Sequence, residues 1–208
     1  MIAIIDYGMG NVGSILNMLR RINVPARLVN DMDALSRAEK LILPGVGSFD
    51  QAMERLRERG FLEGLHRRVI EEHCPVLGIC LGAQLLCETS EEGVLPGLGW
   101  IKGAVRRFRF EGTNAGLKIP HMGWNFVSPR NNAVLFDGYP APPRFYFVHS
   151  YHISCVHDTD VAAVSEYGFN FHAAVSRGNI HGVQFHPEKS HAFGMRLLEN
   201  FARLPGQN

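Results

Sequence analysis

One cysteine in this sequence stands where a nucleophile can be activated. Cys80 is the middle residue of the stretch 78–82, GICLG. The apolar run at 75–79 predicts a short buried strand, and the residues from Ala83 through Cys87 predict a helix. Small residues at this spacing are typical of a sharp strand-to-helix elbow that holds the nucleophile at the end of a sheet. The helix N-terminus there favours a thiolate and can stabilise an oxyanion, although a buried apolar cysteine is the alternative.

His186 and Glu188 are the candidate base and orienting carboxylate that such a cysteine requires. They flank Pro187 at the end of the apolar stretch 182–185. The fixed φ of proline predicts a rigid corner that presents both side chains. We expect His186 to accept the Cys80 proton and later to protonate the leaving group. Glu188 is expected to hold the far ring nitrogen and so to fix the tautomer.

A metal site is the competing interpretation of the histidines. His181, His186 and His191 are spaced five residues apart, which matches no familiar zinc motif and does not bring side chains together on one helix face. We therefore expect no metal. The remaining histidines are interpreted as surface or packing residues, among them His66, His73, His157 and His172.

A glycine-rich stretch near the N-terminus could be mistaken for a dinucleotide site. Residues 8–13, GMGNVG, follow the apolar run 2–5 and precede a helical pattern, with Asp31 about twenty residues further on. So short a pattern is common in strand-to-helix turns. A structural turn or a docking loop is the favoured interpretation, and we expect no nucleotide cofactor.

Composition limits the classes of function. The chain has 208 residues, 46% of them hydrophobic, and a net charge of +1, which fits one α/β domain over residues 1–208 and disfavours nucleic acid and membrane partners. No secretion signal or transmembrane run is evident. The cysteines form no C-x-x-C pair, so a reducing, cytoplasmic location is expected; they are Cys74, Cys80, Cys87 and Cys155.

The elements that must position these groups follow from hydrophobic periodicity. Continuous apolar runs at 2–5, 26–29, 40–43 and 75–79 predict parallel strands covered on both faces, the third stopped by Pro44. The glycine-flanked loop 44–49 could turn a backbone N–H toward a ligand. Helical periodicity marks 52–70 and 191–203. Alternation predicts that 100–110 and 118–127 form a subsidiary antiparallel sheet, followed by strands at 144–151, 161–166, 172–176 and 180–185.

These motifs together resemble the class I (triad) glutamine amidotransferases. The resemblance rests on the stretches 78–86, 44–47 and 186–188, and 120–125, 146–151 and 182–190 resemble one branch, the glutaminase subunits of imidazole glycerol phosphate synthases in histidine biosynthesis. It covers essentially the whole chain. It implies a flavodoxin-like α/β fold in three layers, with a mostly parallel central sheet, helices on both faces and a small antiparallel sheet.

The resemblance also implies an activity. Cys80 would attack the side-chain amide of glutamine, giving a γ-glutamyl thioester that water hydrolyses to glutamate. Ammonia would pass to a separate (β/α)8 barrel cyclase subunit, which makes imidazole glycerol phosphate and aminoimidazole carboxamide ribotide. The oxyanion hole and the glutamine-binding site would comprise Gly45, Val46, Gly47, Leu81, Gln84, His149, Ser150 and Tyr151. The residues implied to face or gate the cyclase are Asn11, His121, Trp124, Tyr146 and Lys189.

Other functions stay open at this point. Ala83 stands where many relatives carry methionine, a conservative change. A paralogous branch supplies ammonia for acetamidino-sugar formation in surface polysaccharides. A non-catalytic nucleotide-binding module using Gly8–Gly13 and a hydrolase of γ-glutamyl peptides are the alternatives from other classes.

Overall fold

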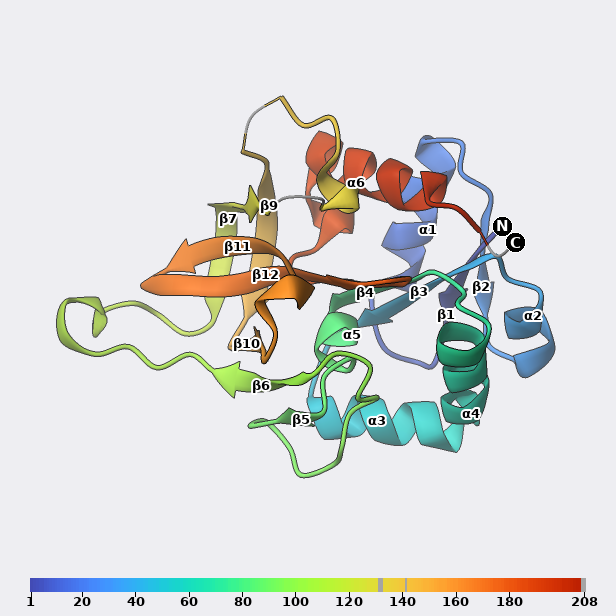
Figure 1. The fold of residues 1–208 in the computed structure, drawn as a ribbon, viewed down its shortest axis with the longest axis horizontal. Coiled ribbons are helices and arrows are strands. Elements are labelled where there is room, and N and C mark those ends of the chain that lie inside the picture. Colours follow the sequence, from blue (N-terminus) through green and yellow to red (C-terminus); the bar gives the residue numbers. More distant parts are fainter. Residues whose placement is uncertain (131–132, 141, 207–208) are drawn as a thin grey trace.

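The computed structural model describes residues 1–130, 133–140 and 142–206. A large twisted sheet forms the middle layer, with helices on both of its faces (Figure 1). The N-terminus and the last described residues lie close together at one end of the molecule, and a second, two-stranded sheet stands near the other end. This arrangement confirms the predicted α/β fold.

The parallel half of the large sheet has the strand order β2-β1-β3-β4-β13, which is the flavodoxin-like order. Its neighbouring strands all run parallel. In such sheets ligands bind beyond the carboxyl ends of the strands, where the strand order reverses. The strands are β1 (Ile2–Ile5), β2 (Ala26–Val29), β3 (Lys40–Gly45), β4 (Val76–Cys80) and β13 (Ile180–Val183).

Alternate side chains of these strands enter two separate cores, because successive strand residues point to opposite faces. Ala3 and Leu41 pack on one face, against α3 and α4, whereas Ile4 and Ile42 pack on the other, against α1 and α6. The helices are α1 (Val12–Arg21), α2 (Met32–Ser36), α3 (Phe49–Glu58), α4 (Phe61–His66), α5 (Leu81–Gln84) and α6 (His191–Arg203), and a π-helical turn at Arg67–Glu71 extends α4. In the described part of the chain, no helix combines the length and apolarity needed to cross a bilayer.

The antiparallel half of the large sheet continues through β12 and β10 to β6, and β5 is added parallel to β6 at the edge. β11 pairs with β12, and β8 pairs with β11. These strands are β5 (Thr89–Ser90), β6 (Gly103–Arg107), β8 (Ser128–Pro129), β10 (Tyr151–Cys155), β11 (Val161–Tyr167) and β12 (Phe169–Arg177). The small sheet pairs β7 (His121–Phe126) with β9 (Arg144–His149). The predicted pairing of 100–110 with 118–127 is therefore wrong: β6 pairs with β10 instead. Period-two alternation identifies a strand but not its partner.

Two predicted boundaries also differ. β3 runs through Pro44 to Gly45. The Leu41 N–H points toward β4, so by alternation the nitrogen of Pro44 faces β1. Pairing with β1 has already ended at Ile42, so the strand loses no hydrogen bond at the proline. The helix after the elbow begins at Leu81 and is a single turn. It stops there because the carbonyls at 85–87 accept hydrogen bonds from the backbone at 98–101 instead.

Candidate active site

Cys80 lies at a strained bend between β4 and α5. Its φ of 54° and ψ of −111° fall in a region that residues with a side chain rarely adopt. The backbone around it is packed too tightly for side chains: a Cβ on Gly78 would lie 2.7 Å from Ala83 Cα, and one on Gly82 would collide with the Leu43 carbonyl oxygen. The flanking glycines thus permit an elbow that holds the sulfur beyond the carboxyl end of β4.

His186 and Glu188 lie just beyond the neighbouring strand β13; His186 precedes a short 3-10 turn, Pro187–Lys189, that contains Glu188. The His186 backbone N–H donates to the Tyr146 carbonyl at 2.9 Å, and the Ser190 hydroxyl donates to the His186 carbonyl at 2.6 Å. The ring Nδ1–H of His186 donates to Glu188 Oε1 at 2.8 Å, with both side chains about 2% exposed or less. The backbone and the carboxylate together fix the orientation of the imidazole.

The electrostatics of this pair favour a protonated histidine. Burial lowers the pKa of His186, but the interactions with Cys80 and Glu188 outweigh it and raise the pKa to about 10. Nε2 of the ring has no hydrogen-bond acceptor among the described protein atoms, and Cys80 lies on that side. The arrangement can therefore exchange a proton between the sulfur and the ring.

Cys80 and His186 open into one cavity of about 330 Å³. It lies where the loops after β3, β4 and β13 meet the link between β9 and β10. The other residues that line it are Val46, Gly47, Leu81, Gln84, Glu92, Pro120, Val148, His149, Ser150, Tyr151 and Lys189. Of the positions expected to bind glutamine, only Gly45 is not in the lining; it pairs with Cys80 in the β3–β4 ladder and packs against the elbow.

Several residues of this region were not identified from the sequence. Glu92 accepts a hydrogen bond at 2.9 Å from the Phe49 N–H, at the start of α3, and burial raises the pKa of its carboxyl. Because Glu92 lies in a polar loop, nothing in the sequence indicated that it lines the cavity. Gln184 is fully buried and its amide Nε2 lies 3.9 Å from Cys80 Sγ. A lone amide within an apolar strand was the available sign that it has a specific partner.

The predicted interface residues differ in how exposed they are. Trp124 is 43% exposed on β7, between Met122 at 61% and Phe126 at 62%, so these side chains do not belong to the core. Lys189 Nζ lies 5.8 Å from the centre of the Tyr146 ring. His121 differs from Trp124: it is only 3% exposed, because its side chain enters the inner face of β7.

Packing explains one glycine of the N-terminal glycine-rich turn. Asn11 precedes α1 and accepts a hydrogen bond from Ser14 Oγ. A Cβ on Gly10 would lie 2.8 Å from Pro44 Cβ, so glycine is required there without any ligand. Asp31, the candidate ribose-binding acid, accepts from the Ala34 N–H at 2.7 Å and caps α2.

The histidines of the rejected metal hypothesis are in unrelated environments. Ser176 Oγ and His181 Nδ1 lie 2.9 Å apart, and the His191 ring stacks on Trp124. Within the described residues, no group of three or more histidine, cysteine, aspartate or glutamate side chains could hold a metal ion.

Comparison with known proteins places this site in a family. The class-I glutamine amidotransferase family matches residues 3–204. Two similar curated proteins are imidazole glycerol phosphate synthase subunit HisH 2 of Methanococcus maripaludis, 52% identical over 98% of this chain and 99% of the relative, and subunit HisH of Bdellovibrio bacteriovorus, 48% identical over 98% and 100%.

Solved structures agree on the fold. The structure of PurLQS from Thermotoga maritima superposes with a TM-score of 0.73 at 18% identity over 96% of each chain. The glutaminase domain of CTPS from Trypanosoma brucei, solved with bound acivicin, gives a TM-score of 0.66 at 16% identity over 97% of this chain and 93% of the other. Because the family match and the nearly full-length relatives agree, the chain belongs to the class-I glutamine amidotransferase family, within the branch of imidazole glycerol phosphate synthase HisH subunits.

Proposed function

We propose that this chain hydrolyses L-glutamine to glutamate and ammonia, with Cys80 as nucleophile, His186 as acid and base, and Glu188 as the residue that orients the histidine. The observation that carries the proposal is the strained Cys80 elbow, which opens into one cavity with His186, while the buried Glu188 carboxylate holds the far side of the His186 ring. Nucleophile, base and orienting carboxylate in this order form the arrangement that acyl transfer requires.

The reaction proceeds in two halves. The Cys80 thiolate forms a bond to the amide carbon of glutamine, and the electron pair of the carbonyl moves onto its oxygen. When the carbonyl re-forms, the C–N bond breaks and His186 gives its proton to the departing ammonia. The γ-glutamyl thioester remains. Water then loses a proton to His186 and attacks the thioester carbon, the C–S bond breaks, and glutamate leaves the restored Cys80.

The cavity lining supports a binding mode for the substrate. The backbone N–H of Leu81, at the start of α5, is the proposed oxyanion donor together with an N–H of the Gly45–Gly47 loop. Gly47 has a φ of 105°, which gives this loop a backbone conformation that favours glycine. Gln84 and the backbone at 149–151 would hold the glutamine head and tail. The Glu92 carboxylate, which lines the cavity, is the complement for the α-ammonium group.

The ammonia acceptor is proposed from the relatives. The proposed partner is a separate (β/α)8 barrel cyclase, which uses the ammonia to make imidazole glycerol phosphate and aminoimidazole carboxamide ribotide in histidine biosynthesis. The outer face of β7, formed by Met122, Trp124 and Phe126, supports a docking role because these large apolar side chains are exposed side by side. Lys189 lines the cavity and also contacts Tyr146, so it would lie between the glutamine site and the cyclase.

Two further features are part of the proposal. The family match over residues 3–204 supports a single glutamine amidotransferase domain for residues 1–208. Cys74, Cys80, Cys87 and Cys155 are all free thiols, which supports a reducing, cytoplasmic location.

The test is the variant Cys80→Ala in the complex with the cyclase. Glutamine-dependent turnover should be lost, whereas ammonia added in solution should still support synthesis of imidazole glycerol phosphate. Cys155→Ala, which removes a thiol outside the cavity, is the matched control and should keep glutamine-dependent turnover. Unchanged glutamine use by Cys80→Ala would exclude this cysteine as the nucleophile. Failure of ammonia to replace glutamine would exclude the transfer step.

A further inference from the structure

A chain of hydrogen bonds runs beneath the cavity and connects the inner face of β7 to the rim of the cavity. His121 Nδ1 and His149 Nε2 lie 2.9 Å apart, and His149 Nδ1 lies 2.7 Å from the Tyr151 carbonyl oxygen. Asn125 Nδ2 lies 3.2 Å from the other nitrogen of His121. Three side chains thus link β7 to the segment that joins β9 to β10.

The donor and the acceptor of each hydrogen bond in this chain can be assigned, and Asn125 Nδ2 also donates to the Glu166 carbonyl at 2.8 Å. Asn125 Oδ1 accepts from the Phe126 N–H at 2.8 Å, so Nδ2 is the end of the amide that donates to His121 Nε2. The Tyr151 carbonyl can only accept, so His149 carries its proton on Nδ1. Burial lowers the pKa of His149 to about 3 and that of His121 to about 4, which keeps both rings neutral. His149 Nε2 is therefore an acceptor, and His121 must also carry its proton on Nδ1.

The same carbonyl connects the histidines to the nucleophile. Gln84 Nε2 donates to the Tyr151 carbonyl at 3.0 Å and to Gln184 Oε1 at 3.1 Å. Gln184 Nε2 in turn lies 3.9 Å from Cys80 Sγ. Since Tyr151 O receives donors from both sides, the carbonyl cannot rotate without breaking a bond to a buried group.

Packing holds the first ring of the chain in place. His121 lies between two aromatic rings, with centroids 4.8 Å from Phe147 and 4.1 Å from Tyr167, and both are stacked on it. His149 packs against Phe108 and Phe171. The rings are therefore preorganised, and the strand that orients them carries the exposed residues Met122, Trp124 and Phe126 on its opposite face.

We propose that Asn125, His121 and His149 are positioning residues for glutamine hydrolysis: through fixed Nδ1–H tautomers they hold the Tyr151 carbonyl and Gln84, and with them the rim of the glutamine cavity. The inference rests on the proposed function and adds residues that do not touch the reacting atoms. It also gives a physical route by which a partner that displaces β7 changes the rim, because Asn125 and Trp124 are neighbours on that strand.

The kinetic test separates hydrogen bonding from packing at one position. His121→Phe keeps an aromatic ring between Phe147 and Tyr167 but removes both hydrogen bonds. His121→Asn loses the ring, yet its amide nitrogen can still donate to His149 Nε2. We expect KM for glutamine to rise about tenfold in His121→Phe, the size of one lost hydrogen bond, and less in His121→Asn. The control His181→Phe makes the same change at a buried histidine outside the cavity and should leave KM unchanged.

A larger rise of KM in His121→Asn than in His121→Phe would overturn the proposal in favour of simple packing. So would an equal rise in His181→Phe. Thermal unfolding of each variant, measured alongside, identifies losses that come from misfolding.

A second measurement needs no activity and no substitution. Nitrogen-15 NMR of the histidine rings in the full chain at neutral pH should show His121 and His149 both as neutral Nδ1–H tautomers. Either ring in the Nε2–H form would overturn the proposed chain of hydrogen bonds. If both rings are Nδ1–H tautomers but the complex does not hydrolyse glutamine, the proposed function fails while the proposed chain of hydrogen bonds stands.

Discussion

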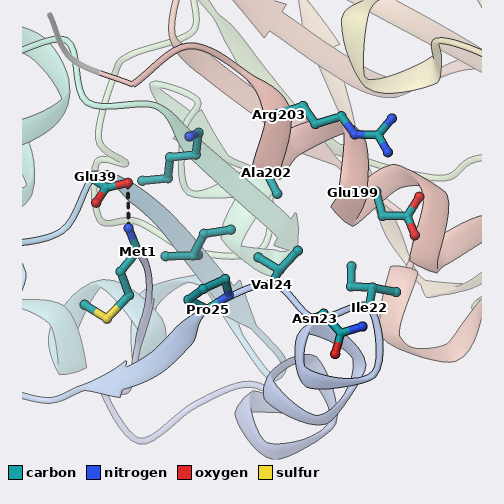
Figure 2. Close-up of a pocket in the computed structure, with 11 residues that line it drawn as sticks. Met1, Ile22, Asn23, Val24, Pro25, Glu39, Glu199, Ala202 and Arg203 are labelled. Atoms are coloured by element: carbon teal, nitrogen blue, oxygen red, sulfur yellow. Dashed lines mark ion pairs between the residues drawn. The ribbon is translucent and has the colours of Figure 1, made fainter.

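Two hollows of similar size lie at opposite ends of the parallel strands, and they differ in chemistry rather than in volume. The cavity at Cys80 has about 330 Å³, whereas a pocket near the amino ends of β1 and β3 has about 390 Å³ (Figure 2). The second pocket is lined by Met1, Ile2, Ile22, Asn23, Val24, Pro25, Glu39, Lys40, Glu199, Ala202 and Arg203. If the larger of these two hollows were taken as the active site, the choice would be wrong.

The difference lies in what the charged groups contact. In the second pocket the Met1 ammonium pairs with Glu39 at 2.6 Å, and this ion pair is exposed, with no cysteine, serine or histidine among the residues that line the pocket. The Cys80 cavity instead contains an imidazole, held by a buried carboxylate, together with a sulfur on a strained backbone. At the carboxyl ends of the parallel strands, loops from distant parts of the chain bring a cysteine and a histidine into one cavity, whereas the distant segments that meet at the amino ends contribute neither residue type to the pocket lining.

The largest expected effect is at His186. His186→Ala removes the group that accepts and returns the proton in both halves of the reaction, so kcat should fall about a thousandfold or more. Steady-state glutaminase assays of the complex provide the measurement. The exposed His157 offers a control, because His157→Ala removes a ring outside the cavity lining. Near-normal turnover in His186→Ala would require a different base.

The next effect is at Glu188. Glu188→Gln keeps an oxygen that can accept the Nδ1–H of His186 but removes the negative charge that stabilises the imidazolium. We expect kcat to fall about ten- to a hundredfold, less than in His186→Ala, because orientation is partly retained. The two variants are compared in the same assay. The reverse order would assign the role of base to another group.

The sequence predicts the parts of this comparison that depend on local pattern. The apolar run ending at Cys80, the proline corner after it and the helix at His191–Arg203 are each defined by neighbouring residues, and the structure has them nearly where expected. A glycine-flanked cysteine carries its own signal because the elbow itself demands small residues.

What the sequence does not predict depends on contacts between distant segments. Glu92 enters the cavity only because its loop packs against the start of α3, 43 residues earlier in the chain. His121 and His149 meet because β7 pairs with β9 across a long connection, whereas alternation favours a pairing with residues 100–110. Side-chain period identifies strands, but tertiary packing selects their partners.

The Glu92→Gln variant sharpens the comparison between the two hollows. Glutamine at this position can still accept from the Phe49 N–H, so α3 should remain capped. The lost charge should raise KM for glutamine about tenfold through its α-ammonium group, with little change in kcat. Glu91→Gln is the neighbouring control, since Glu91 is exposed and pairs with Arg109 outside the cavity. An unchanged KM would remove Glu92 from the binding site.

The smallest effect is expected from the same chemical change in the other hollow. Glu39→Gln removes the charge that pairs with the Met1 ammonium, and this ammonium in turn lowers the pKa of the Glu39 carboxyl. Because the pair is exposed and screened by salt, the midpoint of thermal unfolding should hardly change. Glutamine KM and kcat should equal those of the parent complex, since the pocket lies at the opposite ends of the strands from Cys80. A rise in KM comparable to that of Glu92→Gln would mean that the amino-end pocket communicates with the glutamine site, and the distinction between the two hollows would have to be abandoned.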